Sequence, residues 1–122
     1  MSKTIMIVDD SASLRQVVAI ALKGAGYTVL EGCDGKDAIA KLTGQKVNLI
    51  ISDVNMPNMD GISFVKAVKQ MAAYKFTPIV MLTTESQESK KKEGQEAGAK
   101  AWIVKPFKPD QLLGEVQKLV LP

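Results

Sequence analysis

The stretch "VNLIISDVNMPNMDG", residues 47 to 61, joins an uncharged apolar run to a carboxylate and then to turn-forming residues. Near-continuous apolar runs of this kind are typical of parallel strands that are covered on both faces. The Pro, Asn, Asp and Gly that follow predict a turn directly after the strand. Asp53 therefore lies where a buried strand would reach the surface. An acid there can bind a metal, act as a base, take up a covalent group or only cap a turn.

Apolar runs and amphipathic stretches alternate along the whole chain. The runs at 4–8, 49–52 and 78–83 are predicted to be buried strands, whereas 27–31 and 101–105 mix polar with apolar residues and indicate strands nearer the sheet edges. The stretches between them carry apolar residues at helical spacing, and the first such face comprises Leu14, Val17, Val18, Ala21 and Leu22. Strand and helix alternate five times, which predicts an open α/β sheet with right-handed crossovers.

Composition restricts the class of protein. A chain of 122 residues with 46% apolar content fits one domain with a sizeable core. The net charge of +3 is only a weak hint of nucleic acid or acidic partners, and the single cysteine excludes an internal disulfide. The N-terminus does not read as a signal peptide, and no run approaches the ~18 apolar residues that a membrane helix needs. We therefore expect a cytoplasmic protein that binds neither membrane nor nucleic acid.

Histidine is absent from the sequence. This absence excludes histidine-dependent catalytic triads, histidine metal sites and an internal phosphohistidine. Any chemistry here depends on carboxylates, hydroxyls and lysines, or on side chains that a partner supplies.

Three acids are predicted to meet at one edge of the sheet. Asp9 and Asp10 end the first apolar strand, and Asp53 ends the third. In an open parallel sheet, ligands bind at the carboxyl ends of the strands. Three carboxylates this close repel one another unless a cation lies among them, and oxygen ligands without His or Cys favour a hard ion such as Mg²⁺. One such Asp alone would more often be a helix cap.

Two further polar residues end later strands at the same edge. Thr83 closes the fourth predicted strand with a hydroxyl, and Lys105 closes the fifth with an ammonium group. Together with the acids they offer a metal, a candidate nucleophile, a hydroxyl and a fixed cation. Such a set stabilises a phosphoryl group, because the metal and the lysine neutralise charge on its oxygens.

The segment from Thr83 to Ala101 interrupts the pattern, because it contains no apolar residue larger than alanine. A helix there can bury little and should gain little stability from packing. It is either an ordinary solvated surface helix or a region able to move.

Four motifs resemble those of the receiver domains of two-component response regulators, most closely the stand-alone chemotaxis (CheY-type) kind. They are "VDDS" at 8–11, "DVNMPNMDG" at 53–61, "MLTTE" at 81–85 and "KPF" at 105–107, and the resemblance extends over the whole chain. It implies a flavodoxin-like (βα)5 fold with an open five-stranded parallel sheet, strand order 2-1-3-4-5 and helices on both faces. It also implies that residues 1–122 form a single receiver domain with no effector domain.

The resemblance implies that Asp53 accepts a phosphoryl group from the phosphohistidine of a sensor histidine kinase. The metal would be Mg²⁺, for which Mn²⁺ can substitute, and no other cofactor is expected. Its protein ligands would be the carboxylates of Asp9, Asp10 and Asp53 and the backbone carbonyl of Asn55. The protein would not be an enzyme in the usual sense, because it would promote only its own phosphorylation and dephosphorylation.

The remaining site residues also take roles by resemblance. Thr83 would move to bond the phosphate, and Lys105 would pair with it. The family's aromatic switch position, commonly Tyr or Phe, is Trp102 here. Asn55 and Glu85 occupy the positions that tune phosphoryl lifetime, and their polarity predicts a short-lived phosphoryl state. Expected partners of the monomer are the kinase, a phosphatase and a downstream protein such as the flagellar motor switch.

Three other functions are compatible with these residues. One is a phosphorelay intermediate, which would hand its phosphoryl group to a second histidine protein. Another is a phosphatase of the haloacid dehalogenase type, although the D-x-D-x-T motif of that family is not matched by "VDDSAS" after the first strand. The third is a phosphorylation-independent binding protein, for which Lys90–Lys92 is the only support.

Overall fold

The computed structural model of the chain describes residues 3–42, 45–54, 56, 58–83, 91–105 and 107–120. These residues form one parallel sheet of five strands in the order β2-β1-β3-β4-β5. The strands are β1 (Thr4–Val8), β2 (Thr28–Gly32), β3 (Leu49–Asp53), β4 (Ile79–Thr83) and β5 (Ala101–Val104). The predicted fold and strand order are confirmed, including the placement of the two more polar strands at the edges.

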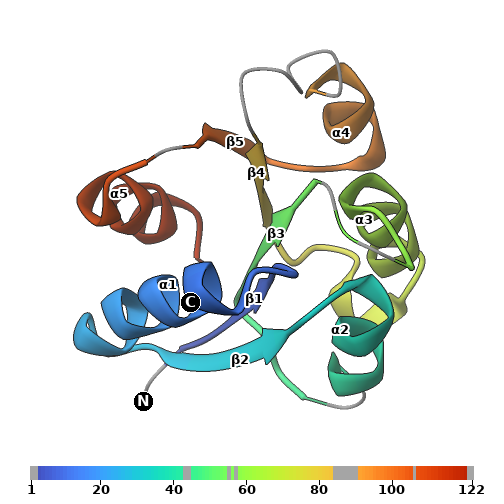
Figure 1. Cartoon of the computed structure of the whole chain (residues 1–122). Coiled ribbons are helices and arrows are strands. Elements are labelled where there is room, and N and C mark those ends of the chain that lie inside the picture. The colour runs from blue at the N-terminus through green and yellow to red at the C-terminus, as the bar shows by residue number, and fades with distance from the viewer. Residues whose placement is uncertain are drawn as a thin grey trace.

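Helices cover both faces of the sheet, as predicted. Helices α1 (Ala12–Gly24) and α5 (Pro109–Leu119) lie on one face, whereas α2 (Gly35–Leu42), α3 (Gly61–Lys69) and α4 (Lys91–Ala97) lie on the other (Figure 1). A short 3-10 helix, Ala72–Tyr74, follows α3. None of the described helices is long and apolar enough to cross a membrane.

The core forms two layers because successive side chains of a strand point to opposite faces of the sheet. Ile5, Ile7 and their counterparts on β3 and β4 pack against α1 and α5. Met6, Val8 and their counterparts pack against α2 and α3. Every residue of β3 and β4 is buried, which explains the nearly unbroken apolar runs in the sequence.

Helix α1 differs from its prediction at one position. Val17 was placed on the buried face by its spacing, but 54% of its surface is exposed, and Val18 and Leu22 fill the core instead. The helix turns a narrower apolar stripe toward the sheet than the sequence pattern indicates.

Two helices begin directly after loops that carry acids. The Ser11 side chain accepts a hydrogen bond from the Leu14 N–H and caps α1. The Asp60 side chain accepts one from the Ser63 N–H at 2.9 Å and caps α3. Both caps satisfy N–H groups that have no partner within the helix, so they help to hold the two acidic loops at the carboxyl edge of the sheet.

Candidate functional site

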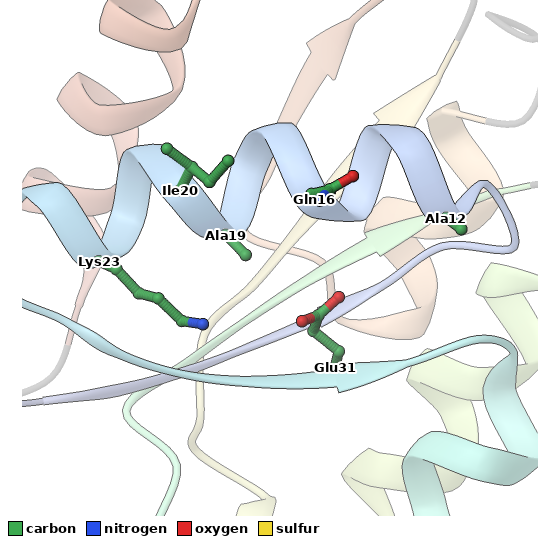
Figure 2. Close-up of a pocket in the computed structure, with 6 residues that line it drawn as sticks. All are labelled: Ala12, Gln16, Ala19, Ile20, Lys23 and Glu31. Carbon is green, nitrogen blue, oxygen red and sulfur yellow. The ribbon is translucent and has the colours of Figure 1, made fainter.

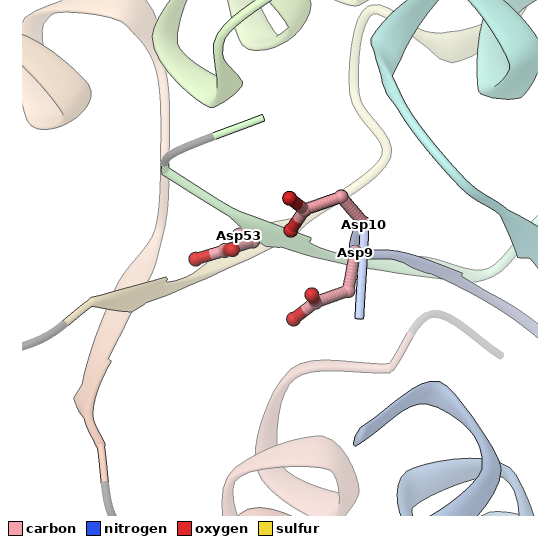
Figure 3. A group of neighbouring side chains, drawn as sticks. All are labelled: Asp9, Asp10 and Asp53. Atoms are coloured by element: carbon pink, nitrogen blue, oxygen red, sulfur yellow. The ribbon is translucent and has the colours of Figure 1, made fainter. Parts of the chain in front are cut away.

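Three carboxylates meet at the carboxyl edge of the sheet. Asp9 and Asp10 follow β1, Asp53 is the last residue of β3, and the two strands are neighbours with Val8 opposite Ser52. One carboxylate oxygen from each acid lies within 4.8 Å of the others (Figure 3). The structure therefore brings together the three acids that the sequence predicted to meet.

The backbone orients two of these carboxylates. Asp9 is buried, and its Oδ1 accepts a hydrogen bond from the Ser11 N–H at 2.8 Å. Asp53 is also buried, and its Oδ1 accepts one from the Val54 N–H at 2.9 Å. Asp10 is exposed. Short loops after each strand thus set the direction of the two buried acids.

Lys105 reaches the acids from the end of β5. Its Nζ lies 3.3 Å from Oδ2 of Asp9 and 3.2 Å from Oδ1 of Asp53. The ammonium group thus bridges carboxylates from two strands, although β4 separates β3 from β5. The long lysine side chain makes this reach possible, with its charged end in the site.

Thr83 is the last residue of β4. This strand lies between β3, which ends at Asp53, and β5, which ends just before Lys105. Thr83 is buried, and it is one residue beyond Leu82, the partner of Asp53 in the ladder between β3 and β4. The hydroxyl predicted from sequence therefore lies at the same edge of the sheet as the acids.

Electrostatics at Asp53 favour a bound cation. Burial raises the pKa of the Asp53 carboxyl above its ordinary value, and the charge of Asp9 raises it further. Lys105 acts in the opposite direction but does not outweigh them. Three carboxylates and one ammonium leave an excess of negative charge. Oxygen donors alone suit a hard divalent ion, so the residues present fit Mg²⁺.

Residues 5–117 match the model of the response regulator receiver domain. The chain belongs to this receiver family. Receiver domains are phosphorylation-activated signalling switches rather than classical enzymes, and they bind Mg²⁺ at an acidic pocket. They interact with histidine kinases and downstream targets. The match gives no support to the haloacid dehalogenase alternative.

Known receivers resemble this one in sequence and structure. The chemotaxis protein CheY4 of Vibrio cholerae is 49% identical, with a TM-score of 0.93 over 98% of this chain and 100% of that one. The receiver domain of the sensor histidine kinase PA1611 from Pseudomonas aeruginosa, solved with a magnesium ion in its active site cleft, is 25% identical. Its TM-score is 0.89, over 98% of both chains.

A curated relative extends beyond the receiver domain. The phosphate regulon transcriptional regulatory protein PhoB of Pseudomonas aeruginosa is 37% identical over 118 residues, which cover 97% of this chain. The chain spans only 52% of that protein. The likeness therefore concerns the receiver domain and not the remainder of the regulator.

Trp102, the predicted switch residue, is partly buried on β5 and packs against the core layer that faces α2 and α3. Its Nε1 is buried and has no hydrogen-bond partner among the described residues. Helix α4 covers the indole at Gly94, where an added Cβ would lie only 2.2 Å from the ring carbon Cζ3. Asn55, Glu85 and Lys90 lie outside the described residues, so the roles assigned to them stay predictions.

Two residues that shape the receiver site were missed from the sequence. Arg15 on α1 donates from Nη1 to the backbone carbonyl of Asp9 at 2.6 Å. Its sequence position does not distinguish it from an ordinary surface arginine. A Cβ added at Gly61 would lie 2.1 Å from the carbonyl oxygen of Asp53, so only glycine fits there. A glycine at the first position of α3, where it is a poor helix former, was the available signal of this close approach.

Proposed function

We propose that this receiver is a phosphorylation-activated switch that takes a phosphoryl group onto Asp53 from a sensor histidine kinase and then changes its partner-binding surface. The observation that carries the proposal is the buried Asp53 carboxylate, 3.2 Å from the Lys105 ammonium and grouped with Asp9 and Asp10. The pKa of the Asp53 carboxyl is raised, and the Lys105 ammonium lies beside it. The ammonium can neutralise the negative charge of a phosphoryl group that approaches Asp53. Residues 1–122 contain no histidine, so the donor histidine lies outside this domain.

The two oxygens of Asp53 have different surroundings. Oδ1 accepts the Val54 N–H and contacts Lys105, whereas no described residue donates to Oδ2. We assign Oδ2 as the attacking oxygen. It forms the new bond to phosphorus while the phosphorus–nitrogen bond to the partner's histidine breaks and the imidazole keeps that electron pair. Oδ1 stays held by Val54, so the attacking oxygen is aimed before the donor arrives.

The other site residues neutralise and read the transferred group. Asp9, Asp10, Asp53 and the carbonyl of Asn55 would hold Mg²⁺, with Mn²⁺ as a substitute. The bound ion would supply positive charge to the phosphoryl oxygens. Lys105 supplies a second positive charge from the β5 side, and the Thr83 hydroxyl donates to the new phosphate. Self-dephosphorylation would follow, at a rate that Asn55 and Glu85 tune by orienting water.

The switch would run from Thr83 to Trp102. Phosphorylation gives the Thr83 hydroxyl a new acceptor and draws it toward Asp53. Trp102 lies on the adjacent strand and beneath α4, so a change of its rotamer would alter the surface that α4 and β5 present. Residues 1–122 would act as one cytoplasmic monomer, and the output of this domain would be partner binding.

The likeness to CheY4 supports bacterial chemotaxis, with the flagellar motor switch as the downstream target. A pull-down of the motor switch protein with and without a beryllofluoride phosphoryl mimic tests this assignment. Capture that depends on the mimic and on Asp53 is expected. Equal capture in both conditions would contradict phosphorylation control of that target.

Labelling with a small phosphodonor tests the nucleophile. With Mg²⁺ present, intact mass should show one added phosphoryl group that is labile to acid and base, and a chelator should suppress it. Asp53→Asn should abolish the label. Asp60→Asn is the matched control from the same loop, because asparagine caps a helix as well as aspartate does. Full labelling of Asp53→Asn at the wild-type rate would refute the assignment.

A further inference from the structure

The Arg15 side chain folds back over the turn that precedes its own helix. Nη1 donates to the carbonyl oxygen of Asp9 at 2.6 Å, and Nε lies 3.4 Å from Oε1 of Glu31. Figure 2 shows that the Glu31 side chain points from β2 toward α1. The Arg15 side chain is only 18% exposed. Its guanidinium lies between α1, the edge strand β2 and the loop that follows β1.

The bond to Asp9 fixes a peptide group and not a carboxylate. The carbonyl of Asp9 belongs to the peptide that links it to Asp10, so its direction also sets the direction in which Asp10 leaves the strand. The same residue is held on its other side, because the Asp9 N–H donates to the carbonyl of Gly32 at 3.1 Å. Arg15 completes the restraint with a short, charge-assisted hydrogen bond, the stronger kind.

Asp10 depends on this restraint more than the other acids do. The carboxylate of Asp9 accepts the Ser11 N–H, and that of Asp53 accepts the Val54 N–H. Asp10 is exposed, and no described residue donates a hydrogen bond to its carboxylate. Its place in the cluster is therefore decided by the backbone, at the peptide that Arg15 holds.

We propose that Arg15 is a positioning residue for the metal site: by holding the peptide between Asp9 and Asp10, it turns the Asp10 carboxylate toward Asp9 and Asp53. This inference rests on the proposed Mg²⁺ site. Glu31 has a supporting part, because its carboxylate forms an ion pair with Nε of Arg15 from the side of β2, although no hydrogen bond joins them. Groups that orient metal ligands in this way commonly contribute 10–100-fold to metal affinity.

The charge of Arg15 acts in the opposite direction. A guanidinium beside an acidic cluster repels a divalent cation, so loss of its charge alone would strengthen metal binding. Loss of the hydrogen bond to Asp9 would weaken it, because Asp10 would no longer be held in place. The two roles predict opposite signs, and a metal titration therefore separates them.

The test is a calorimetric Mg²⁺ titration of the full chain, repeated with Mn²⁺. Arg15→Gln removes the positive charge and the planar set of guanidinium N–H donors. We expect its Kd for Mg²⁺ to rise about 10-fold or more. Arg15→Lys loses the planar guanidinium but keeps an ammonium that can still donate to the Asp9 carbonyl, so we expect a smaller rise in the Kd for Mg²⁺. Glu31→Gln should also weaken binding, by less than Arg15→Gln. Gln16→Ala, an exposed neighbour on the same turn of α1, is the matched control and should bind as wild type does.

Denaturant unfolding with a chelator present shows whether each variant is folded. If Arg15→Gln does not fold, Arg15→Lys decides because it keeps the charge, and it must then bind Mg²⁺ more weakly than wild type. Binding by a folded Arg15→Gln as tight as wild type, or tighter, overturns the positioning role and leaves the proposed function intact. Failure of the wild type itself to bind Mg²⁺ overturns the proposed metal site, and this inference with it.

Discussion

Replacing Gly94 with alanine tests whether the α4 backbone closes directly over the Trp102 indole. A Cβ at position 94 would lie 2.2 Å from Cζ3 and 2.8 Å from Cη2 of the ring. Carbon atoms in ordinary contact are about 3.5 Å apart, so the indole or the helix would have to retreat by about 1.3 Å. Since the ring is rigid and its Nε1 end is buried, the strain falls on the Trp102 rotamer or on the position of α4.

The size of the effect follows from two opposing contributions. Overpacking of this kind costs about 1–3 kcal/mol of folding free energy, whereas alanine gains about 1 kcal/mol over glycine inside a helix. With Trp102 present, Gly94→Ala should therefore change the stability by between about zero and a loss of about 2 kcal/mol. Trp102→Phe removes Cζ3 and Cη2, the two indole atoms that the added Cβ would press on. In that background only the helix gain remains, and Gly94→Ala should stabilise by about 1 kcal/mol.

The assay is a double-mutant cycle on denaturant unfolding, followed by far-ultraviolet circular dichroism because half of the variants lack the only tryptophan. We expect a coupling free energy of about 1–3 kcal/mol between positions 94 and 102, as for residues in contact. Gly94→Ala should also change Trp102 emission and quencher access without any phosphoryl mimic. The same stability change in both backgrounds, together with unchanged emission, would refute the packing argument and the switch built on it.

Two further changes test the site. With a chelator present, Asp53→Asn should raise the free energy of unfolding at neutral pH. The reason is that the raised pKa of Asp53 favours folding only while the carboxyl is protonated, and this contribution is lost as pH rises through the folded-state pKa. This gain in the free energy of unfolding should shrink toward zero below pH of about 4, as Asp53 becomes protonated in both the folded and the unfolded state. A lower free energy of unfolding for Asp53→Asn at neutral pH would contradict the burial argument. Gly61→Ala should cost about 1–3 kcal/mol and slow phosphorylation, because its Cβ would press on the backbone of Asp53. Gly114→Ala in α5, where nothing lies within 4 Å, should instead stabilise by about 0.5–1 kcal/mol in the same unfolding assay, and equal effects at the two glycines would refute the close approach.

The fold was predictable because its signals are local and repeated. Uncharged runs such as 49–52 report burial on both faces, and helical spacing reports one buried face, so the order of elements follows from short windows of sequence. The meeting of Asp9, Asp10 and Asp53 was predictable for a related reason. Parallel strands end at one edge of the sheet, so acids at the ends of neighbouring strands are brought together by topology alone.

Some contacts were decided only by the tertiary structure. They connect side chains of different helices and strands, and the sequence does not specify how far apart those elements lie. Arg15 meets the Asp9 carbonyl because α1 starts close enough to β1 for its side chain to fold back, and the same arginine on a tilted helix would lie in solvent. Gly94 meets Trp102 because the packing of α4 brings this glycine against the indole on β5. Val17 satisfies the helical pattern and still faces outward, whereas Val18 and Leu22 of the same helix are buried. Periodicity records which face of an element is apolar, whereas side-chain contacts between elements depend on separations of a few ångströms that only packing of the whole domain sets.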